Sequence, residues 1–129
     1  MTPDEAIEEL TFHCGSNPNI DDPRWGRGFL SMLRPYKGLH QETYDHLIQC
    51  VRTLAPQLAR DDCVDRRVVS SLWGICHLAR SWGLHPQGML RRNQLITEED
   101  QERLERWIEA LSYDLMMLLD GNEPEGPLS

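Results

Sequence analysis

Apolar side chains recur at steps of three and four residues along most of this chain, and helix-start and helix-end residues frame each such stretch. No run alternates polar and apolar residues with a period of two, as a half-buried strand would. Together these patterns leave helices as the only regular structure that the chain can form. The sequence therefore predicts an all-α protein, a compact bundle or orthogonal array of about five helices.

The predicted helices cover residues 3–14, 23–34, 41–58, 62–82 and 97–120. Thr2 and Pro3 start the first helix, and Gly15 is placed to end it. The second helix contains two glycines, which weaken it by roughly 1 kcal/mol each. We expect Pro56 to kink or end the third helix, because proline lacks the N–H that the helix needs.

The fourth predicted helix, 62–82, is apolar or small on nearly every side. A helix of that composition is usually buried, so we place it at the centre of the bundle. Its main apolar stripe is Val64, Val68, Leu72, Ile75, Ala79 and Trp82. Large aromatics dominate the packing of small domains, so we expect Trp25, Trp82 and Trp107 in the core. Trp73 lies off the main stripe and either fills a second layer of core or faces a partner.

A chain of 129 residues is long enough to bury one core without disulfides or a structural metal. The prediction is a single helical domain over 1–120, followed by a flexible tail at 121–129 that has little apolar content.

Acidic residues outnumber basic ones by 21 to 13, which gives a net charge of −8. That charge repels nucleic acids and anionic lipids, and no apolar run approaches the ~20 residues of a membrane span. The four cysteines contain no CxxC pair, so we expect four reduced thiols in a cytoplasmic protein. Neither a nucleic acid nor a membrane is an expected partner.

One set of side chains has the residue types of a zinc site. His46 and Cys50 are one helical turn apart, and Cys76 and His77 could complete the set. Helix phase argues against it, because it points His46 toward solvent and separates Cys76 from His77 by about 100°. We therefore assign no metal and no cofactor, and keep these four residues as the alternative.

No sequence motif of phosphate binding, nucleophilic catalysis or metal hydrolysis is present. No catalytic residue is assigned, and the expectation is a protein that is not an enzyme.

The sequence favours a surface that contacts another protein. Four side chains lie off the main apolar stripes of their helices and suit an interface: Trp73, Tyr113, Met116 and Met117. The connection 84–96 is long for a bundle, and we expect its Arg91 and Arg92 to contact a partner. The alternative is that both arginines pair with the acids at 98–100. A second basic patch, suited to an anion or an acidic partner, is Arg24, Arg27, Arg34 and Lys37.

The sequence thus favours a small acidic protein that acts as a non-enzymatic interaction or regulatory module, with another protein as partner. Toxin-immunity proteins are one compatible class, by composition alone. The alternative function is a small-molecule or metal-binding helical bundle, which could be enzymatic, and homodimerisation is an alternative to a foreign partner.

Overall fold

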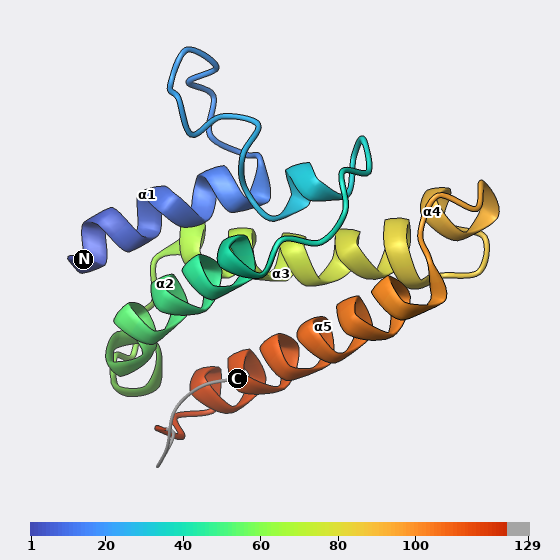
Figure 1. Cartoon of the computed structure of the whole chain (residues 1–129). Coiled ribbons are helices and arrows are strands. Elements are labelled where there is room, and N and C mark those ends of the chain that lie inside the picture. The colour runs from blue at the N-terminus through green and yellow to red at the C-terminus, as the bar shows by residue number, and fades with distance from the viewer. Residues whose placement is uncertain (124–129) are drawn as a thin grey trace.

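The computed structural model describes residues 1–123, in which helices are the regular structure and no strand forms (Figure 1). The four long helices are α1 (Pro3–Cys14), α2 (Gln41–Arg60), α3 (Arg66–Ala79) and α5 (Glu98–Leu119). The short elements are η1 (Leu30–Met32), the π-helical turn η2 (Arg80–Leu84) and α4 (Met89–Arg92). The predicted all-α class is therefore confirmed. No helix among the described residues is long and apolar enough to cross a membrane.

Side-chain caps begin three of the four long helices, α1, α3 and α5. The hydroxyl oxygen of Thr2 accepts a hydrogen bond from the Glu5 amide, and Thr97 accepts one from the Asp100 amide, both at 3.1 Å. Asp65, rather than Asp62, caps α3 by accepting from the Arg67 amide. Gly15 ends α1 in the left-handed conformation.

The four long helices form a closed ring in the order α1, α2, α5, α3 (Figure 1). Each packs against its two neighbours, while the diagonal pairs α1/α5 and α2/α3 make no close backbone contact within the described range. α3 packs against α1, α5 and the short elements η1 and η2. It forms one side of the ring and is not the central helix that the sequence predicted. One face of α3 is exposed, at Ser70, Trp73 and His77.

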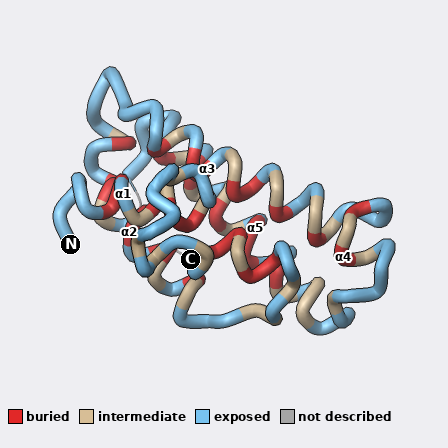
Figure 2. Tube along the Cα trace, turned by 90° about the horizontal axis from the view of Figure 1, so that it is seen from above, coloured by how far each residue is buried: buried red, intermediate tan, exposed pale blue. Residues whose placement is uncertain are grey.

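The buried positions repeat along the inward sides of these helices (Figure 2). Tyr44 of α2 and Trp107 of α5 stack with ring centroids 4.5 Å apart, and Phe29 packs beside both rings. This aromatic group joins α2, α5 and the segment before η1 into one core. Trp25, expected in the core, is instead 50% exposed.

The helix predicted at 23–34 is wrong: only the three-residue η1 forms there. Asn17, Asn19 and Asp22 accept backbone N–H groups two residues ahead, which favours turns over a helix. Gly26 has a φ of 78°, a left-handed value that also stops a helix.

Two other helix ends differ from expectation. Pro56 does not end α2, which continues to Arg60. Because proline has no N–H, the helix loses only the hydrogen bond to the Arg52 carbonyl, and Arg52 and Pro56 are both exposed. After Ala79 the chain widens into η2 before turning, and the connection beyond it contains α4, whose Leu90 is fully buried. Most of the predicted tail, residues 124–129, lies outside the described residues.

Candidate functional site

α5 presents one long exposed face that is both acidic and apolar. Its other face is held in the core by Leu104, Ile108 and Leu111, which are fully buried. Because residues three and four apart share a helical face, the outward side carries Glu102, Glu105, Glu109, Tyr113 and Met116. Tyr113 and Met116 are each more than half exposed.

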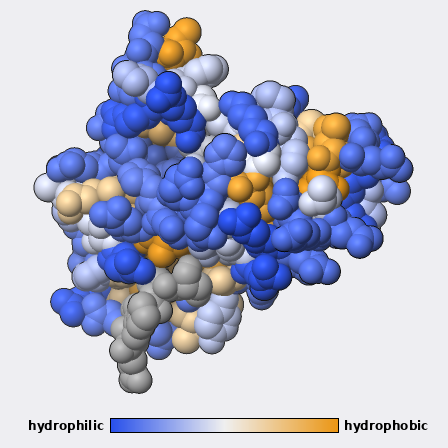
Figure 3. Space-filling model, in the orientation of Figure 1, coloured by the Kyte–Doolittle hydropathy of each residue, from blue (hydrophilic) through white to orange (hydrophobic). Residues whose placement is uncertain are grey.

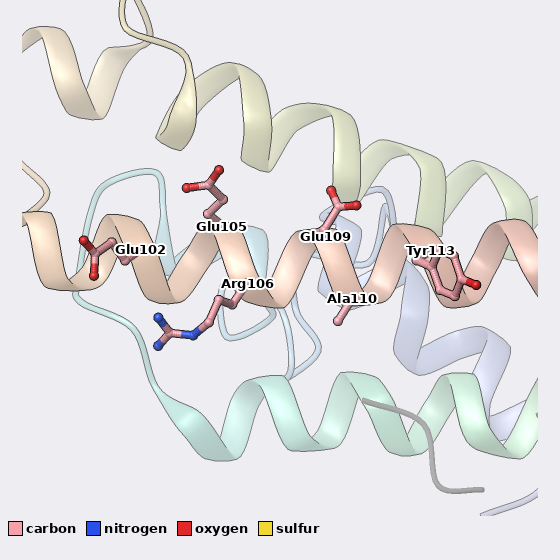
Figure 4. Close-up of a pocket in the computed structure, with 6 residues that line it drawn as sticks. All are labelled: Glu102, Glu105, Arg106, Glu109, Ala110 and Tyr113. Atoms are coloured by element: carbon pink, nitrogen blue, oxygen red, sulfur yellow. The ribbon is translucent and has the colours of Figure 1, made fainter.

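A shallow groove of about 600 Å³ follows this face (Figure 4). In Figure 4, Glu105 and Glu109 project toward the α3 side of α5, and Arg106 and Ala110 project toward the α2 side. The groove is lined by Glu102, Glu105, Arg106, Glu109, Ala110 and Tyr113.

The charge of the groove is largely unbalanced. Glu109 lies 3.4 Å from the Arg80 guanidinium, in a bridge exposed on both sides. Glu102 and Glu105 make no ion pair with any described residue. Only Arg106 contributes a positive charge to the lining, so the groove favours a cationic ligand.

The exposed face of α3 borders the same surface. Arg80 donates a hydrogen bond of 2.7 Å to the Ser112 hydroxyl and so joins the end of α3 to α5. Trp73 and His77 share the helical face of Arg80, and the Trp73 side chain is 69% exposed. A second hollow, of about 500 Å³, includes His77, Arg80, Glu105 and Glu109 among its lining residues, so the two hollows share two glutamates.

We call this the α3–α5 surface, defined by Trp73, His77, Arg80, Glu102, Glu105, Glu109, Tyr113 and Met116. It brings three of the predicted interface residues, Trp73, Tyr113 and Met116, onto two neighbouring helices. The fourth predicted interface residue, Met117, follows Met116 in the sequence and is half-buried. The face of the molecule shown in Figure 3 is mainly hydrophilic, with separate hydrophobic patches.

The two loop arginines occupy different settings. Arg91 is half-buried and donates a hydrogen bond of 2.9 Å to the Leu84 carbonyl, which closes the turn before α4. Arg92 is exposed. Neither pairs with the acids at 98–100 within the described residues.

The predicted basic patch is divided among separate local contacts. Arg24 forms ion pairs with Glu8, Glu9 and Asp22. Its side-chain hydrogen bond to Asp22, followed by that of its backbone amide, lowers the pKa of Asp22 to about 2. Arg34 lies over the Trp82 ring at 5.3 Å, and Lys37 reaches the Gly26 carbonyl at 3.5 Å. Arg27 is exposed at the edge of a third hollow.

That third hollow, of about 390 Å³ between α1 and α2, lies over a histidine–cysteine cluster. His13 of α1 meets His46 and Cys50 of α2, and the ligand atoms of all three lie within 4.8 Å of one another. His46 is half-buried against His13 rather than turned to solvent. Cys76 and His77 lie on α3 and belong to no such three-residue group within residues 1–123.

The hydrogen bonds fix the protons of this cluster. The Phe29 amide donates to His13 Nδ1 at 3.0 Å, so the neutral His13 ring carries its proton on Nε2 and donates it to His46 Nδ1 at 2.8 Å. Burial, reinforced by His46, lowers the pKa of His13 to about 3. Burial, followed by the charge of Glu9, raises the pKa of the Cys50 thiol to about 12. As a protonated thiol, Cys50 is a poor nucleophile.

Sequence reasoning missed His13 and the glutamates of α5. Glu9 and His13 are four residues apart, as are His46 and Cys50, and this paired spacing is the signal that could have identified the cluster. The glutamates carry no comparable signal, because acidic side chains on a helix are normally just solvated.

Comparison with known protein families, with curated proteins and with solved structures gives no match.

Proposed function

We propose that this protein is a non-enzymatic interaction module that binds a basic, partly apolar segment of another protein on its α3–α5 surface. The observation that carries the proposal is one groove of α5 in which Glu102 and Glu105, which make no ion pair with a described residue, lie with the exposed Tyr113. The exposed Met116 follows Tyr113 on the same helix. Exposed apolar groups of this size, rimmed by charge, typify protein interfaces.

Charge complementarity favours a basic partner. The groove offers Glu102, Glu105 and Glu109 against the single cation Arg106, and the whole chain carries a charge of −8. A segment rich in lysine or arginine is steered to such a surface, and its apolar side chains would cover Tyr113 and Met116. The four free thiols are consistent with a reducing, cytoplasmic setting for this encounter.

Photo-crosslinking in the native host tests the proposal. A photoreactive phenylalanine analogue at position 113 should give adducts with basic segments of a partner, identified by mass spectrometry of the crosslinked peptides. The same analogue at position 25 is the matched control, since Trp25 is also an exposed aromatic residue but lies in the loop after α1.

Adducts from position 113 should disappear when Glu102 and Glu105 are both changed to lysine. Equal adducts from positions 25 and 113, adducts only with acidic segments, or no adducts at 113 would contradict the proposal.

A further inference from the structure

Two facing pairs of metal-ligand side chains lie at the contact between α1 and α2, away from the α3–α5 surface. Glu9 and His13 are one turn apart on α1, and His46 and Cys50 are one turn apart on α2. Because α1 packs directly against α2, the two pairs meet under one hollow, whose lining includes Glu9, His13 and His46. The Glu9 carboxylate is close enough to affect the Cys50 thiol electrostatically.

We propose that this cluster binds a divalent transition-metal ion of the zinc class through His13 Nε2, His46 Nδ1 and Cys50 Sγ, with Glu9 or a water molecule as the fourth ligand. Two imidazoles and a thiol are the donors that zinc prefers, whereas magnesium and calcium require a set of oxygen ligands. Arg24 contacts Oε1 of Glu9, which leaves Oε2 for a metal.

The separation of the two imidazole nitrogens is already close to the value that a metal requires. Zinc–nitrogen bonds of about 2.0–2.1 Å at a tetrahedral angle place the two ligand nitrogens about 3.3 Å apart. His13 Nε2 and His46 Nδ1 are now 2.8 Å apart, so the rings must separate by about half an ångström. The half-buried His46 lines the hollow, which gives an ion a route to the site from solvent.

Metal binding also rearranges protons. The proton on His13 Nε2 must leave, and a neutral ring then carries its proton on Nδ1, where it faces the Phe29 amide. The hydrogen bond from Phe29 therefore breaks, and Cys50 releases its thiol proton to solvent. Losing one buried hydrogen bond weakens an equilibrium by roughly tenfold to a hundredfold. Zinc-finger peptides bind zinc with dissociation constants on the order of 10⁻⁷ to 10⁻¹² M, so a loss of that size still leaves measurable binding.

Cobalt titration of the full chain, after removal of metal with a chelator, tests the site. Co²⁺ bound to a thiolate gives a near-ultraviolet charge-transfer band, which we expect to saturate at one equivalent and to be displaced by Zn²⁺. In a parallel titration with diamagnetic Zn²⁺, the Phe29 amide resonance should shift and saturate at one equivalent, because its hydrogen bond to His13 is lost.

Matched variants exist within the chain. Cys50→Ser should abolish the band. His46→Gln removes a direct ligand and should weaken binding by at least about 100-fold, because loss of a group that only supports a ligand can already cost that much. Cys76→Ser and His77→Gln, which alter a buried cysteine and an exposed histidine outside the cluster, should leave the titration unchanged. Circular dichroism of each variant confirms that it is folded.

Absence of the band in the folded wild type, its persistence in Cys50→Ser, or its loss in Cys76→Ser would overturn the proposal. None of these outcomes depends on a protein partner, so the test is independent of the interaction function.

Discussion

Leu72 and Trp73 are neighbours on α3 with opposite environments. Leu72 is 0% exposed and Trp73 is 69% exposed. Leu72→Ala should lower the free energy of unfolding by about 2–5 kcal/mol, because it leaves a cavity in the core. Trp73→Ala should change that free energy by no more than about 0.5 kcal/mol, yet weaken partner binding. Urea denaturation measures the first effect, and a large loss of stability in Trp73→Ala would show that this side chain is part of the core.

The buried tyrosine Tyr44 predicts how stability falls at alkaline pH. Burial, followed by the charges of Asp114 and Asp45, raises the pKa of Tyr44 to about 12, against about 10 in an unfolded chain. Above pH 10 the unfolded state therefore loses a proton that the folded state keeps, and stability falls as the pH rises toward 12. The loss from Tyr44 is about 1.4 kcal/mol per pH unit across that interval.

Urea unfolding at pH 9 to 11.5 checks this sign. Tyr44→Phe should lose less stability across the range than the wild type does, whereas Tyr113→Phe, which changes an exposed tyrosine, is the control. Parallel curves for the wild type and Tyr44→Phe would contradict the prediction. Tyr36, whose hydroxyl donates to Asp100 at 2.6 Å, also has a raised pKa from burial and this bond, so a smaller slope remains in Tyr44→Phe.

Among the elements, the segment that joins α1 to η1 depends on one close approach. A Cβ on Gly28 would collide with the Phe12 carbonyl oxygen and would lie 2.5 Å from His13 Cα, both backbone atoms that cannot move alone. Gly28→Ala should therefore destabilise the protein by more than about 3 kcal/mol. Gly26→Ala meets open space, and its positive φ costs only about 1–2 kcal/mol. Equal losses in thermal or urea melts would show that the approach at Gly28 is not tight.

The same segment shows why sequence patterns located some elements and missed others. The starts of α1 and α5 depend on Thr2 and Thr97, whose caps are local and visible in the sequence. The loop before η1 has apolar residues at helical spacing, but Phe29 is held by His13 of a different element, and spacing alone carries no such information. The prediction that His46 faces solvent is wrong for the same reason. The spacing within α2 does not show that α1 covers this side chain.

At the scale of the whole molecule, three of the four cysteines report whether the ring of helices opens as one unit. Cys63 is exposed, while Cys50 on α2 and Cys76 on α3 are buried on opposite sides of the ring. Burial raises the pKa of both buried thiols, to about 12 and about 11, so neither forms a reactive thiolate while folded. With metal removed, a thiol reagent should label Cys63 quickly and should reach Cys50 and Cys76 only through unfolding.

Because one continuous core includes Cys50, Cys76 and Leu72, opening at either cysteine should require opening of the whole domain. Leu72→Ala should then accelerate labelling of Cys50 and of Cys76 by the same factor, at least about 30-fold for a loss of 2 kcal/mol or more. Mass spectrometry of the labelled peptides gives both rates in one experiment. Acceleration of Cys76 alone would mean that α3, which carries Leu72, opens while α2 stays folded, and the ring would then be two cooperative units instead of one.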